Sequence, residues 1–383
     1  MMKLLLIVGS ANDIFIYNYA KWLKASMDVS IDVFEFFPSK QQGYGNEYYD
    51  CVTSAKSCGI PRLRTHIDSF VKGRNLTAYL HDKHFDIIHC HWIIDPLVLA
   101  KGLKNHCQYL VATFWGKEYA NIKILGSNAR FRKYLYPFIK DVDAIIDGSE
   151  FEQILRDELP MYCGKFYYAS FGSSPVEELY SLMEKESRND SKRAWNMPID
   201  KFCTMIGYSA KHVHQHLSII AELSKNHDLK RELHLLAPMT RGGNKDYTEK
   251  VRRALNNSGY TYTLIEGRFL SDLEVAQLRN ATDITLQLSA SDAFSRSIVE
   301  CLCAKSIMIY GDWLGYDNHL RAAGFTAIKV GSIEDGIKKI RSVIENINTY
   351  NDMISINHNN GKQRHLWSEC IKDWVNAYNE LLK

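Results

Sequence analysis

The sequence predicts an α/β protein of two domains, each built around a parallel β-sheet. Short apolar runs alternate along the chain with segments of helical periodicity, which is typical of parallel strands joined by crossover helices. At 383 residues the chain is long enough for two separate hydrophobic cores. A charged, polar segment at 173–200, bounded by Pro175 and Pro198, separates two sets of apolar runs and suits a helix-containing linker.

The strands are assigned to short apolar runs rich in β-branched and aromatic residues. In the first half they are Lys3–Val8, Val29–Phe34, Ile87–Cys90, Tyr109–Thr113, Ala144–Asp147 and Lys165–Ala169. In the second half they are Cys203–Gly207, Leu233–Ala237, Thr261–Ile265, Ile284–Leu288, Ser306–Tyr310 and Ala327–Val330. We therefore expect an N-terminal domain at 1–172, the linker at 173–200 and a second domain at 201–360. Apolar residues at helical spacing predict a last helix at 361–383.

Composition excludes several classes of protein. A net charge of +3 is too small to indicate nucleic-acid binding. Nine cysteines without a C-x-x-C pair are typical of reduced thiols in a cytoplasmic protein. The apolar start, Leu4 to Val8, is too short for a signal peptide or a membrane span and reads as a first strand, and no run of 18 apolar residues occurs. We expect a cytoplasmic protein, soluble or peripheral at the inner face of the cell membrane.

The most informative motif lies at 278–313, LRNATDITLQLSASDAFSRSIVECLCAKSIMIYGDW. A predicted strand leads into a Ser-rich loop that holds Asp292, and a helix opening near Ser295 carries Glu300. Helix geometry places Glu300 about one and a half turns inside that helix. Two acids at a strand-to-helix junction can accept hydrogen bonds from the hydroxyls of a ribose and a sugar ring. A capping Asp followed by a solvated helix Glu would give the same spacing.

This segment resembles the donor-binding motif of nucleotide-sugar glycosyltransferases with the GT-B fold, written E-x7-E within "EGFGLPxxEAMACGxPVI". Asp292 stands for the first Glu, Phe294 and Ser295 lie where Phe and Gly are expected, and Glu300 matches the second Glu. The preceding stretch, GRFLSDLEVAQLRNATDITLQLS at 267–289, is similar to "GxVSxEELxxLYxxADVxVxPS".

The resemblance implies two Rossmann-like domains facing a central cleft, with the C-terminal helix crossing back to the N-terminal domain. It implies a hexosyltransferase type of enzyme that acts with retention, without metal and without a cofactor, and uses a nucleotide-sugar as co-substrate. Glu300 would accept the ribose hydroxyls and Asp292 would orient the donor sugar.

In the first half, Gly9 and Ser10 follow the first strand, where a glycine lets the backbone approach a ligand closely. The full G-x-G-x-x-G of a dinucleotide site is missing, which argues against NAD. The segment FDIIHCHWIIDPL at 85–97 ends a strand with His89, His91 and Trp92, and it resembles the family's "DxxHxHxxx". Two His on one strand face are also half of a zinc site, although no third ligand is evident.

The loop TFWGKEYAN at 113–121 is similar to the family's "TxHGxD" or "TxWGSD" loop. Glu118 stands where that family often has Asp, so it is a candidate acceptor-side carboxylate. A solvated Lys-Glu pair is the alternative. If the reaction uses a protein base, His91 and Glu118 are the candidates.

The first strand of the second half ends in IGYSAKHVHQHLSIIAEL at 206–223. In the family the corresponding loop, "VGRLxxxKG", holds the diphosphate through Arg, Lys and a helix N-terminus. Here Gly207 is followed by Tyr208 instead of Arg, so the cationic role would pass to Lys211, His214 or His216. Arg268 is a further candidate. The loop also resembles that of 4-acetamido-4,6-dideoxygalactose transferases, as does the stretch at 234–255.

A basic and aromatic segment, Asn121 to Lys140, is the richest candidate for contact with a bilayer. A helix there could lay its aromatic side on the membrane, or pack that side into the core and leave a solvated basic face.

These observations predict transfer of a sugar to a glycan or polyprenyl-linked acceptor in bacterial-type surface polysaccharide synthesis. A catalytically silent nucleotide- or sugar-binding GT-B protein and a sugar-nucleotide 2-epimerase remain as alternatives. The missing Arg at 208 and the missing Glu at 292 make the silent protein credible. The epimerase would need further acids and histidines around the sugar.

Overall fold

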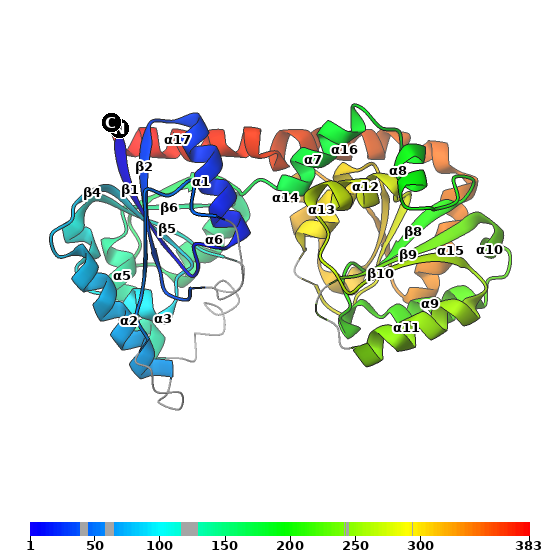
Figure 1. The fold of residues 1–383 in the computed structure, drawn as a ribbon, viewed down its shortest axis with the longest axis horizontal. Helices are drawn as coiled ribbons and strands as arrows, with labels where there is room; N and C mark the ends of the chain where they lie inside the picture. The colour runs from blue at the N-terminus through cyan, green and yellow to red at the C-terminus, as the bar shows by residue number, and fades with distance from the viewer. Residues whose placement is uncertain (39–44, 58–64, 116–128, 241, 243–244, 293) are drawn as a thin grey trace. The chain divides into compact units, whose positions relative to one another are not determined.

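The computed structural model describes residues 1–38, 45–57, 65–115, 129–240, 242, 245–292 and 294–383. The chain divides into two compact units, which we call unit 1 (1–171 with 367–383) and unit 2 (172–366). Both contain parallel sheets covered by helices, so the predicted α/β class is confirmed. Figure 1 shows the strands and the helices of each unit.

Within the described residues, unit 1 holds a seven-stranded parallel sheet in the order β3-β2-β1-β4-β5-β6-β7. The central strands β1 and β4 are buried along most of their length because helices cover both faces of the sheet. The strands are β1 (Met2–Val8), β2 (Val29–Glu35), β3 (Cys51–Ser54), β4 (Phe85–His91), β5 (Cys107–Thr113), β6 (Ala144–Asp147) and β7 (Lys165–Tyr168). The helices are α1 (Ile14–Ser26), α2 (Thr65–Leu80), α3 (Asp95–Leu99), α5 (Ala129–Asp141), α6 (Ser149–Glu158) and α17 (Trp367–Leu381).

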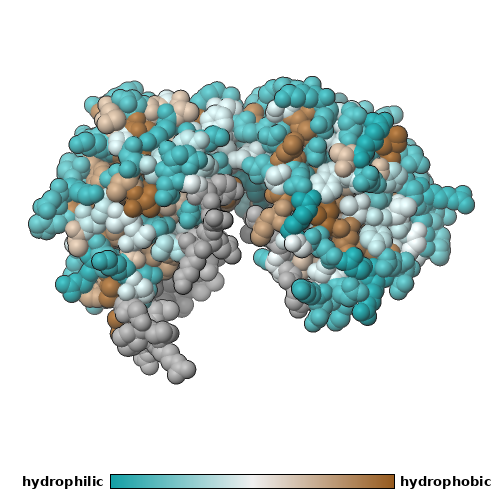
Figure 2. Space-filling model, viewed as in Figure 1, coloured by the Kyte–Doolittle hydropathy of each residue, from teal (hydrophilic) through white to brown (hydrophobic). Residues whose placement is uncertain are grey.

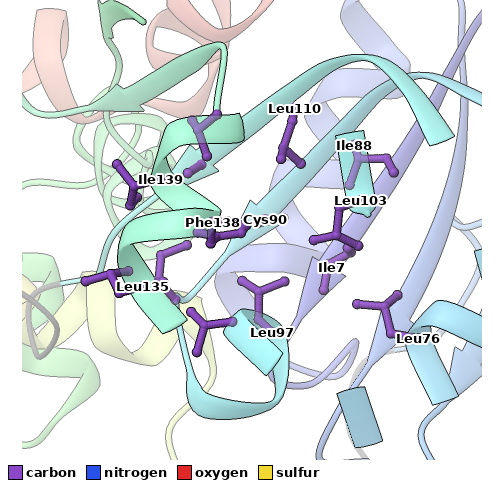
Figure 3. Packing of buried hydrophobic residues seen from close by; sticks show 14 of the residues in the cluster. Ile7, Leu76, Ile88, Cys90, Leu97, Leu103, Leu110, Leu135, Phe138 and Ile139 are labelled. Atoms are coloured by element: carbon purple, nitrogen blue, oxygen red, sulfur yellow. The ribbon is translucent and has the colours of Figure 1, made fainter. Parts of the chain in front are cut away.

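The helix α5 favours the second of the two alternatives for part of the 121–140 segment, a helix that packs its apolar side into the core. Leu135, Phe138 and Ile139 are buried in the core beneath the sheet, together with residues of β4 and α3, as Figure 3 shows. The apolar side of this helix therefore packs into the protein instead of facing a bilayer. Its exposed side carries Lys133 and Lys140. Residues 121–128 lie outside the described residues.

The helix α17 belongs to unit 1 although it lies about 200 residues beyond the last strand of that unit. Its buried residues repeat at helical spacing, and they pack with Leu4, Leu6 and Tyr19 in one core cluster on the face that also carries α1. In Figure 1 the red helix α17 runs beside the blue helix α1. The buried residues of α17 are Trp367, Cys370, Ile371, Trp374, Ala377, Tyr378 and Leu381.

The described residues of unit 2 form a six-stranded parallel sheet in the order β10-β9-β8-β11-β12-β13. Its strands are β8 (Phe202–Ile206), β9 (Leu233–Met239), β10 (Thr261–Glu266), β11 (Ile284–Gln287), β12 (Ile307–Gly311) and β13 (Ile328–Val330). Its helices are α7 (Ser174–Met183), α8 (Arg188–Ala194), α9 (His216–Ser224), α10 (Leu229–Glu232), α11 (Lys245–Ser258), α12 (Asp272–Ala281), α13 (Arg296–Cys303), α14 (Asp317–Ala323), α15 (Ile333–Glu345) and α16 (Asn351–His365).

The segment expected to be a linker forms α7 and α8, which pack against α12 within unit 2. Arg188 at the start of α8 donates hydrogen bonds to the Asn280 and Ala304 carbonyls (3.0 and 2.9 Å) and to Asp283 (3.0 Å). These bonds satisfy carbonyl groups that the ends of α12 and α13 leave unpaired. The segment is thus an integral part of unit 2.

The surface is mostly polar. Figure 2 shows small, separate apolar patches on the visible face of each unit. Among the helices that the structure describes, none combines the length and the apolar character that a membrane span requires.

Candidate functional site

The candidate site of unit 2 lies where the strand order changes direction. After β8 the chain continues to β9 on one side, while β11 pairs with β8 on the other. The loops that follow β8 and β11 therefore meet at the carboxyl edge of the sheet, which is where open α/β sheets bind ligands. A backbone hydrogen bond from Ala290 to Val213 (2.7 Å) joins these two loops.

Asp292 is the centre of a hydrogen-bond network in these loops. The hydroxyls of Tyr208 and Tyr316 donate to its two carboxylate oxygens, one to each. The backbone N–H of Ser295 donates to the same oxygen as Tyr316 (3.1 Å), and the amide of Gln287 donates to the Tyr316 hydroxyl (3.0 Å). Burial, followed by the contact with Asp292, raises the pKa of both tyrosines, so both remain donors at neutral pH. Asp292 therefore acts here as a carboxylate acceptor.

The loop around Asp292 is held in a strained conformation. Phe294 adopts a positive φ of 55°, which is uncommon for a bulky residue. Its ring stacks on His319 with an interplanar angle of 9° and packs edge-on against Tyr316. Strain of this kind costs on the order of 1–3 kcal/mol and collects at ligand-binding loops. Ser295 is the N-cap of α13 and thus places the first turn of this helix beside Asp292.

The loop after β8 turns at Gly207, whose φ of 67° suits glycine. An added Cβ there would lie 2.7 Å from Nε2 of His216 and 2.9 Å from Cβ of His214. His214 is hydrogen-bonded on both sides, to Ser209 (2.7 Å) and Ser289 (2.8 Å), and therefore fastens the β8 loop to the β11 loop.

The two buried histidines of this loop, His214 and His216, are not cations at neutral pH. Burial lowers the pKa of His214 to about 4 and that of His216 to about 3. His216 hydrogen-bonds Tyr247 through Nδ1 (3.1 Å), and its Nε2 is buried without a partner among the described residues. The third predicted cation, Lys211, is exposed and lies close to Gly242. Its contact with the diphosphate stays a prediction.

Two predicted donor-binding residues have other partners. Glu300 is 7% exposed and forms an ion pair with Arg279 of α12 (3.1 Å), whose exposure is also 7%. Burial raises the pKa of Glu300, and Arg279 opposes that shift. Arg268 pairs with Glu274 (2.6 Å) and its guanidinium lies over the ring of Trp195. Neither side chain is joined by a described contact to the Asp292 network.

In unit 1 the corresponding change of strand order lies between β1 and β4. Gly9 follows β1, and the close approach that it allows is to Trp92: an added Cβ would lie 2.3 Å from Cε3 of the indole. Ser10 lies next in this loop, partly exposed, and its Oγ accepts a hydrogen bond from the N–H of Asn12 (3.3 Å). Glu118 lies outside the described residues.

His91 is enclosed by aromatic rings. Its ring centroid lies 5.3 Å from that of Tyr19, 6.1 Å from Trp374 and 6.5 Å from Trp115. Both ring nitrogens are buried and have no hydrogen-bond partner among the described residues. Burial lowers the pKa of His91 to about 3, so the ring is neutral but a weak base. A role for His91 as general base stays a prediction.

His89 lies two residues before His91 on β4, and its hydrogen bonds connect this strand to α17. The Thr113 hydroxyl donates to the Ile146 carbonyl (2.7 Å), so its oxygen accepts from Nε2–H of His89 (2.8 Å). Nδ1 of His89 then accepts from the Tyr378 hydroxyl (2.5 Å), which in turn accepts from Tyr19 (2.5 Å). The donor and the acceptor of every hydrogen bond in this buried series are therefore determined. With both nitrogens engaged, His89 cannot join His91 in binding zinc.

Across the described residues, no group of three or more His, Cys, Asp or Glu side chains could hold a metal ion.

No protein-family model and no curated protein matches the sequence. Solved structures do match. Sucrose-phosphate synthase from Thermosynechococcus elongatus superposes with a TM-score of 0.71 at 12% identity and covers 100% of this chain and 99% of that chain. WaaG, a glycosyltransferase involved in lipopolysaccharide biosynthesis, gives 0.66 at 14% identity and covers 99% of both chains. The chain has the GT-B fold.

A UDP-GlcNAc 2-epimerase from Neisseria meningitidis, bound to UDP-GlcNAc, also matches, with a TM-score of 0.64 at 12% identity over 99% of this chain and 100% of that chain. At these identities the likeness establishes the fold alone. A glycosyltransferase and an epimerase share this fold, so the fold does not distinguish the two activities.

Sequence reasoning missed three members of the unit 2 site: Tyr316, His214 as a connector of the loops, and Tyr208 as a partner of Asp292. Tyr208 was noticed only as a departure from the Arg of the family motif. The sequence does contain a signal for this contact, because a tyrosine hydroxyl is a hydrogen-bond donor and the carboxylate of Asp292 accepts hydrogen bonds.

Proposed function

We propose that this protein is a glycosyltransferase that moves a sugar from a nucleotide-sugar donor to a glycan or lipid-linked acceptor, with retention, in bacterial-type surface polysaccharide synthesis. The observation that carries the proposal is the Asp292 network at the carboxyl edge of β8 and β11, in a chain with the GT-B fold. The likeness to WaaG, a glycosyltransferase involved in lipopolysaccharide biosynthesis, supports the class of acceptor.

Asp292 would orient the donor sugar. A carboxylate has about four lone-pair sites, and two tyrosine hydroxyls and one backbone N–H use three of them. About one site therefore remains for a sugar hydroxyl. Because Tyr208 and Tyr316 fix both oxygens, the carboxylate needs no reorganisation when the donor binds, which is the condition for efficient electrostatic catalysis.

The leaving nucleotide would be stabilised by Lys211 and by the N-terminal end of α9, the nine-residue helix that follows the β8 loop. Helix N-termini favour anions because their N–H groups and the helix dipole point outward. With Tyr208 in place of an arginine, we expect weaker binding of the nucleotide than an arginine would give.

The proposal is tested by Asp292→Asn. We expect transfer to fall about 100-fold, because a hydrogen bond to a charged group contributes about 1.5–3 kcal/mol and a tenfold change in rate corresponds to about 1.4 kcal/mol. The assay measures nucleotide release from UDP-, GDP- and dTDP-sugars, with and without a lipid-linked glycan acceptor. Glu152→Gln is the matched control, since Glu152 is a partly exposed carboxylate of unit 1 that accepts a hydrogen bond from the Tyr168 hydroxyl.

The outcomes separate the candidate functions. Acceptor-dependent nucleotide release that Asp292→Asn abolishes and Glu152→Gln leaves intact supports a transferase. Interconversion of UDP-GlcNAc with its 2-epimer, without an acceptor, identifies an epimerase. Nucleotide binding without turnover identifies a silent binding protein. An Asp292→Asn enzyme within about threefold of wild type would remove Asp292 from the site.

The reaction is proposed to need no metal, because Lys211 and α9 supply positive charge at the leaving group. We expect transfer to be unchanged by excess EDTA. The check is the same nucleotide-release assay after dialysis against chelator, and loss of activity restored by Mg²⁺ or Mn²⁺ would contradict metal independence.

A peripheral contact with the membrane would bring a lipid-linked acceptor to unit 1. The exposed side of α5 fits this role: Lys133, Tyr136, Pro137 and Lys140 lie at helical spacing and line a surface hollow of about 360 Å³. Two cations beside an aromatic ring suit an anionic bilayer surface.

Flotation with vesicles tests this contact. We expect wild-type protein to float with vesicles that contain phosphatidylserine, and to remain behind with pure phosphatidylcholine, because each lysine near an anionic surface contributes about 1 kcal/mol. Lys133→Glu with Lys140→Glu should abolish flotation. Lys21→Glu with Lys101→Glu, an equal change of charge at exposed positions of unit 1, should not. Equal behaviour of the two double variants would show that α5 makes no specific contact.

A further inference from the structure

Trp92 is the most unusual exposed residue of unit 1. It directly follows β4 and adopts a φ of 72°, in the left-handed region that bulky side chains rarely occupy. Its indole is 36% exposed, whereas Trp374 and Trp367 of α17 are 0% and 1% exposed. The protein thus accepts backbone strain of about 1–3 kcal/mol to present an aromatic ring to solvent. Burial does not explain that arrangement.

Two contacts fix the position of the indole. One edge of its six-membered ring lies so close to Gly9 that a Cβ at that position would be 2.3 and 2.5 Å from Cε3 and Cζ3. The Trp115 ring lies 6.0 Å away, centroid to centroid, at an interplanar angle of 28°. The backbone N–H of Trp92 also donates to the Thr113 carbonyl (3.2 Å). Trp92 is therefore a rigid platform at the carboxyl edge of β1, β4 and β5.

The chemistry of the platform suits a pyranose ring. A pyranose presents a flat face of C–H groups, and the electron-rich face of an indole attracts such weakly positive hydrogens. The adjoining loop offers the side chains of Ser10 and Asn12, both partly exposed, as hydrogen-bonding partners for sugar hydroxyls. Ligand sites are typically lined by apolar and aromatic groups, with a small number of polar groups that fix the orientation of the ligand.

A nucleobase would stack equally well, but its phosphates would need cations. The described contacts of Trp92 and Gly9 involve backbone and aromatic groups. Lys72 lies over the ring of Phe37, whose N–H bonds the Gly9 carbonyl, but this lysine is paired with Asp68 (2.9 Å). Within the part of the chain that the structure describes, the charges near Gly9 therefore favour a neutral sugar.

We propose that Trp92 is the platform on which the terminal sugar of the acceptor stacks, so that the acceptor is recognised by a pyranose ring and not by a lipid phosphate alone. This assignment rests on the proposed transferase function, since it gives unit 1 the acceptor role. Gly9 has a positioning role in this assignment, because a side chain at that residue would occupy the space of the Trp92 indole.

The test compares three variants. Trp92→Ala removes the platform, and Trp92→Phe keeps an aromatic face. Gly9→Ala leaves the indole intact but displaces it, because the new Cβ would occupy its place. Phe70→Ala is the control, since Phe70 is another exposed aromatic of unit 1, on α2. Binding of a panel of methyl pyranosides and short glycans is measured by saturation-transfer NMR, and binding of UDP-sugars by calorimetry.

We expect Trp92→Ala and Gly9→Ala each to raise the dissociation constant of the best glycoside at least tenfold, and Trp92→Phe and Phe70→Ala to change it less than threefold. In turnover, the KM for the acceptor should rise while the donor affinity stays constant. Unchanged glycoside binding in Trp92→Ala, or no glycoside binding to the wild type, would overturn the assignment. Failure of all UDP-, GDP- and dTDP-sugars to bind would instead count against the proposed transferase, and glycoside binding lost on Trp92→Ala would still locate a sugar site.

Discussion

Acidification from pH 7 to about pH 5 is expected to unfold this protein. Burial lowers the pKa of five histidines to about 3 or 4, and that of His89 well below its ordinary value. The five are His91, His214, His216, His234 and His365. Each is neutral in the folded protein, whereas the unfolded chain takes up a proton near pH 6.5. The stability that these residues provide is thus present above pH 6.5 and is lost as the pH falls.

The size of the effect follows from linkage. Each such histidine costs about 1.4 kcal/mol of stability per pH unit below 6.5, hence about 2 kcal/mol at pH 5. Four of the five, His214, His216, His234 and His365, lie in unit 2, and their combined cost of about 8 kcal/mol at pH 5 is comparable to the whole stability of an ordinary domain, about 5–15 kcal/mol. The histidines of unit 1 and unit 2 act on their own units, so two transitions are expected if the units unfold independently.

Urea unfolding at intervals between pH 7.5 and 5 measures this dependence, since its slope reports the number of protons taken up. His91→Phe should lower the slope by about one proton in unit 1. His81→Phe, at an exposed position, is the control. A slope below one proton between pH 6.5 and 5, where carboxylates contribute little, would contradict the buried neutral histidines.

Replacement of Glu300 by Gln should destabilise unit 2 by about 3–5 kcal/mol, because it leaves the Arg279 guanidinium buried without a charged partner. Arg279→Met should cost a similar amount. The double variant Glu300→Leu with Arg279→Met should recover most of that loss, since buried ion pairs can be replaced by apolar residues of similar volume. Denaturant unfolding of the single and double variants provides the comparison.

The same variants test whether Glu300 binds the ribose. If Glu300 acts only through Arg279, the folded fraction of Glu300→Gln should bind UDP as well as the wild type does. If it also accepts the ribose hydroxyls, the dissociation constant for UDP should rise in the folded protein. Calorimetry under conditions where the variant is folded distinguishes these two results.

The central strands were predictable because they are mostly apolar runs that helices bury from both sides. The strand β3 was missed for the opposite reason: Cys51–Ser54 is a short edge strand with the partly exposed pattern of a loop. The helical periodicity of 361–383 predicted α17, and the resemblance to GT-B enzymes supplied its attachment to the first unit. Periodicity says which face of a helix is apolar, but not which sheet receives it.

The site was less predictable because the spacing of two residues in the sequence does not show where their side chains point. Asp292 and Glu300 have the spacing of the E-x7-E motif, yet Asp292 faces the loop network and Glu300 faces Arg279. The apolar residues that surround Glu300 in α13 indicated a buried helix. The histidines at 89, 91, 214 and 216 suggested ligands or cations from their side-chain chemistry, whereas burial and hydrogen bonding decide their charge.

The attachment of α17 to unit 1 has a consequence for synthesis on the ribosome. The sheet of unit 1 is translated by residue 168, but the helix that covers β1 follows about 200 residues later. At 5–20 residues per second this interval lasts about 10–40 s, and during it unit 2 is completed first. Until α17 is translated, the part of this core cluster that α17 covers stays exposed on the first sheet, where chaperones can bind it.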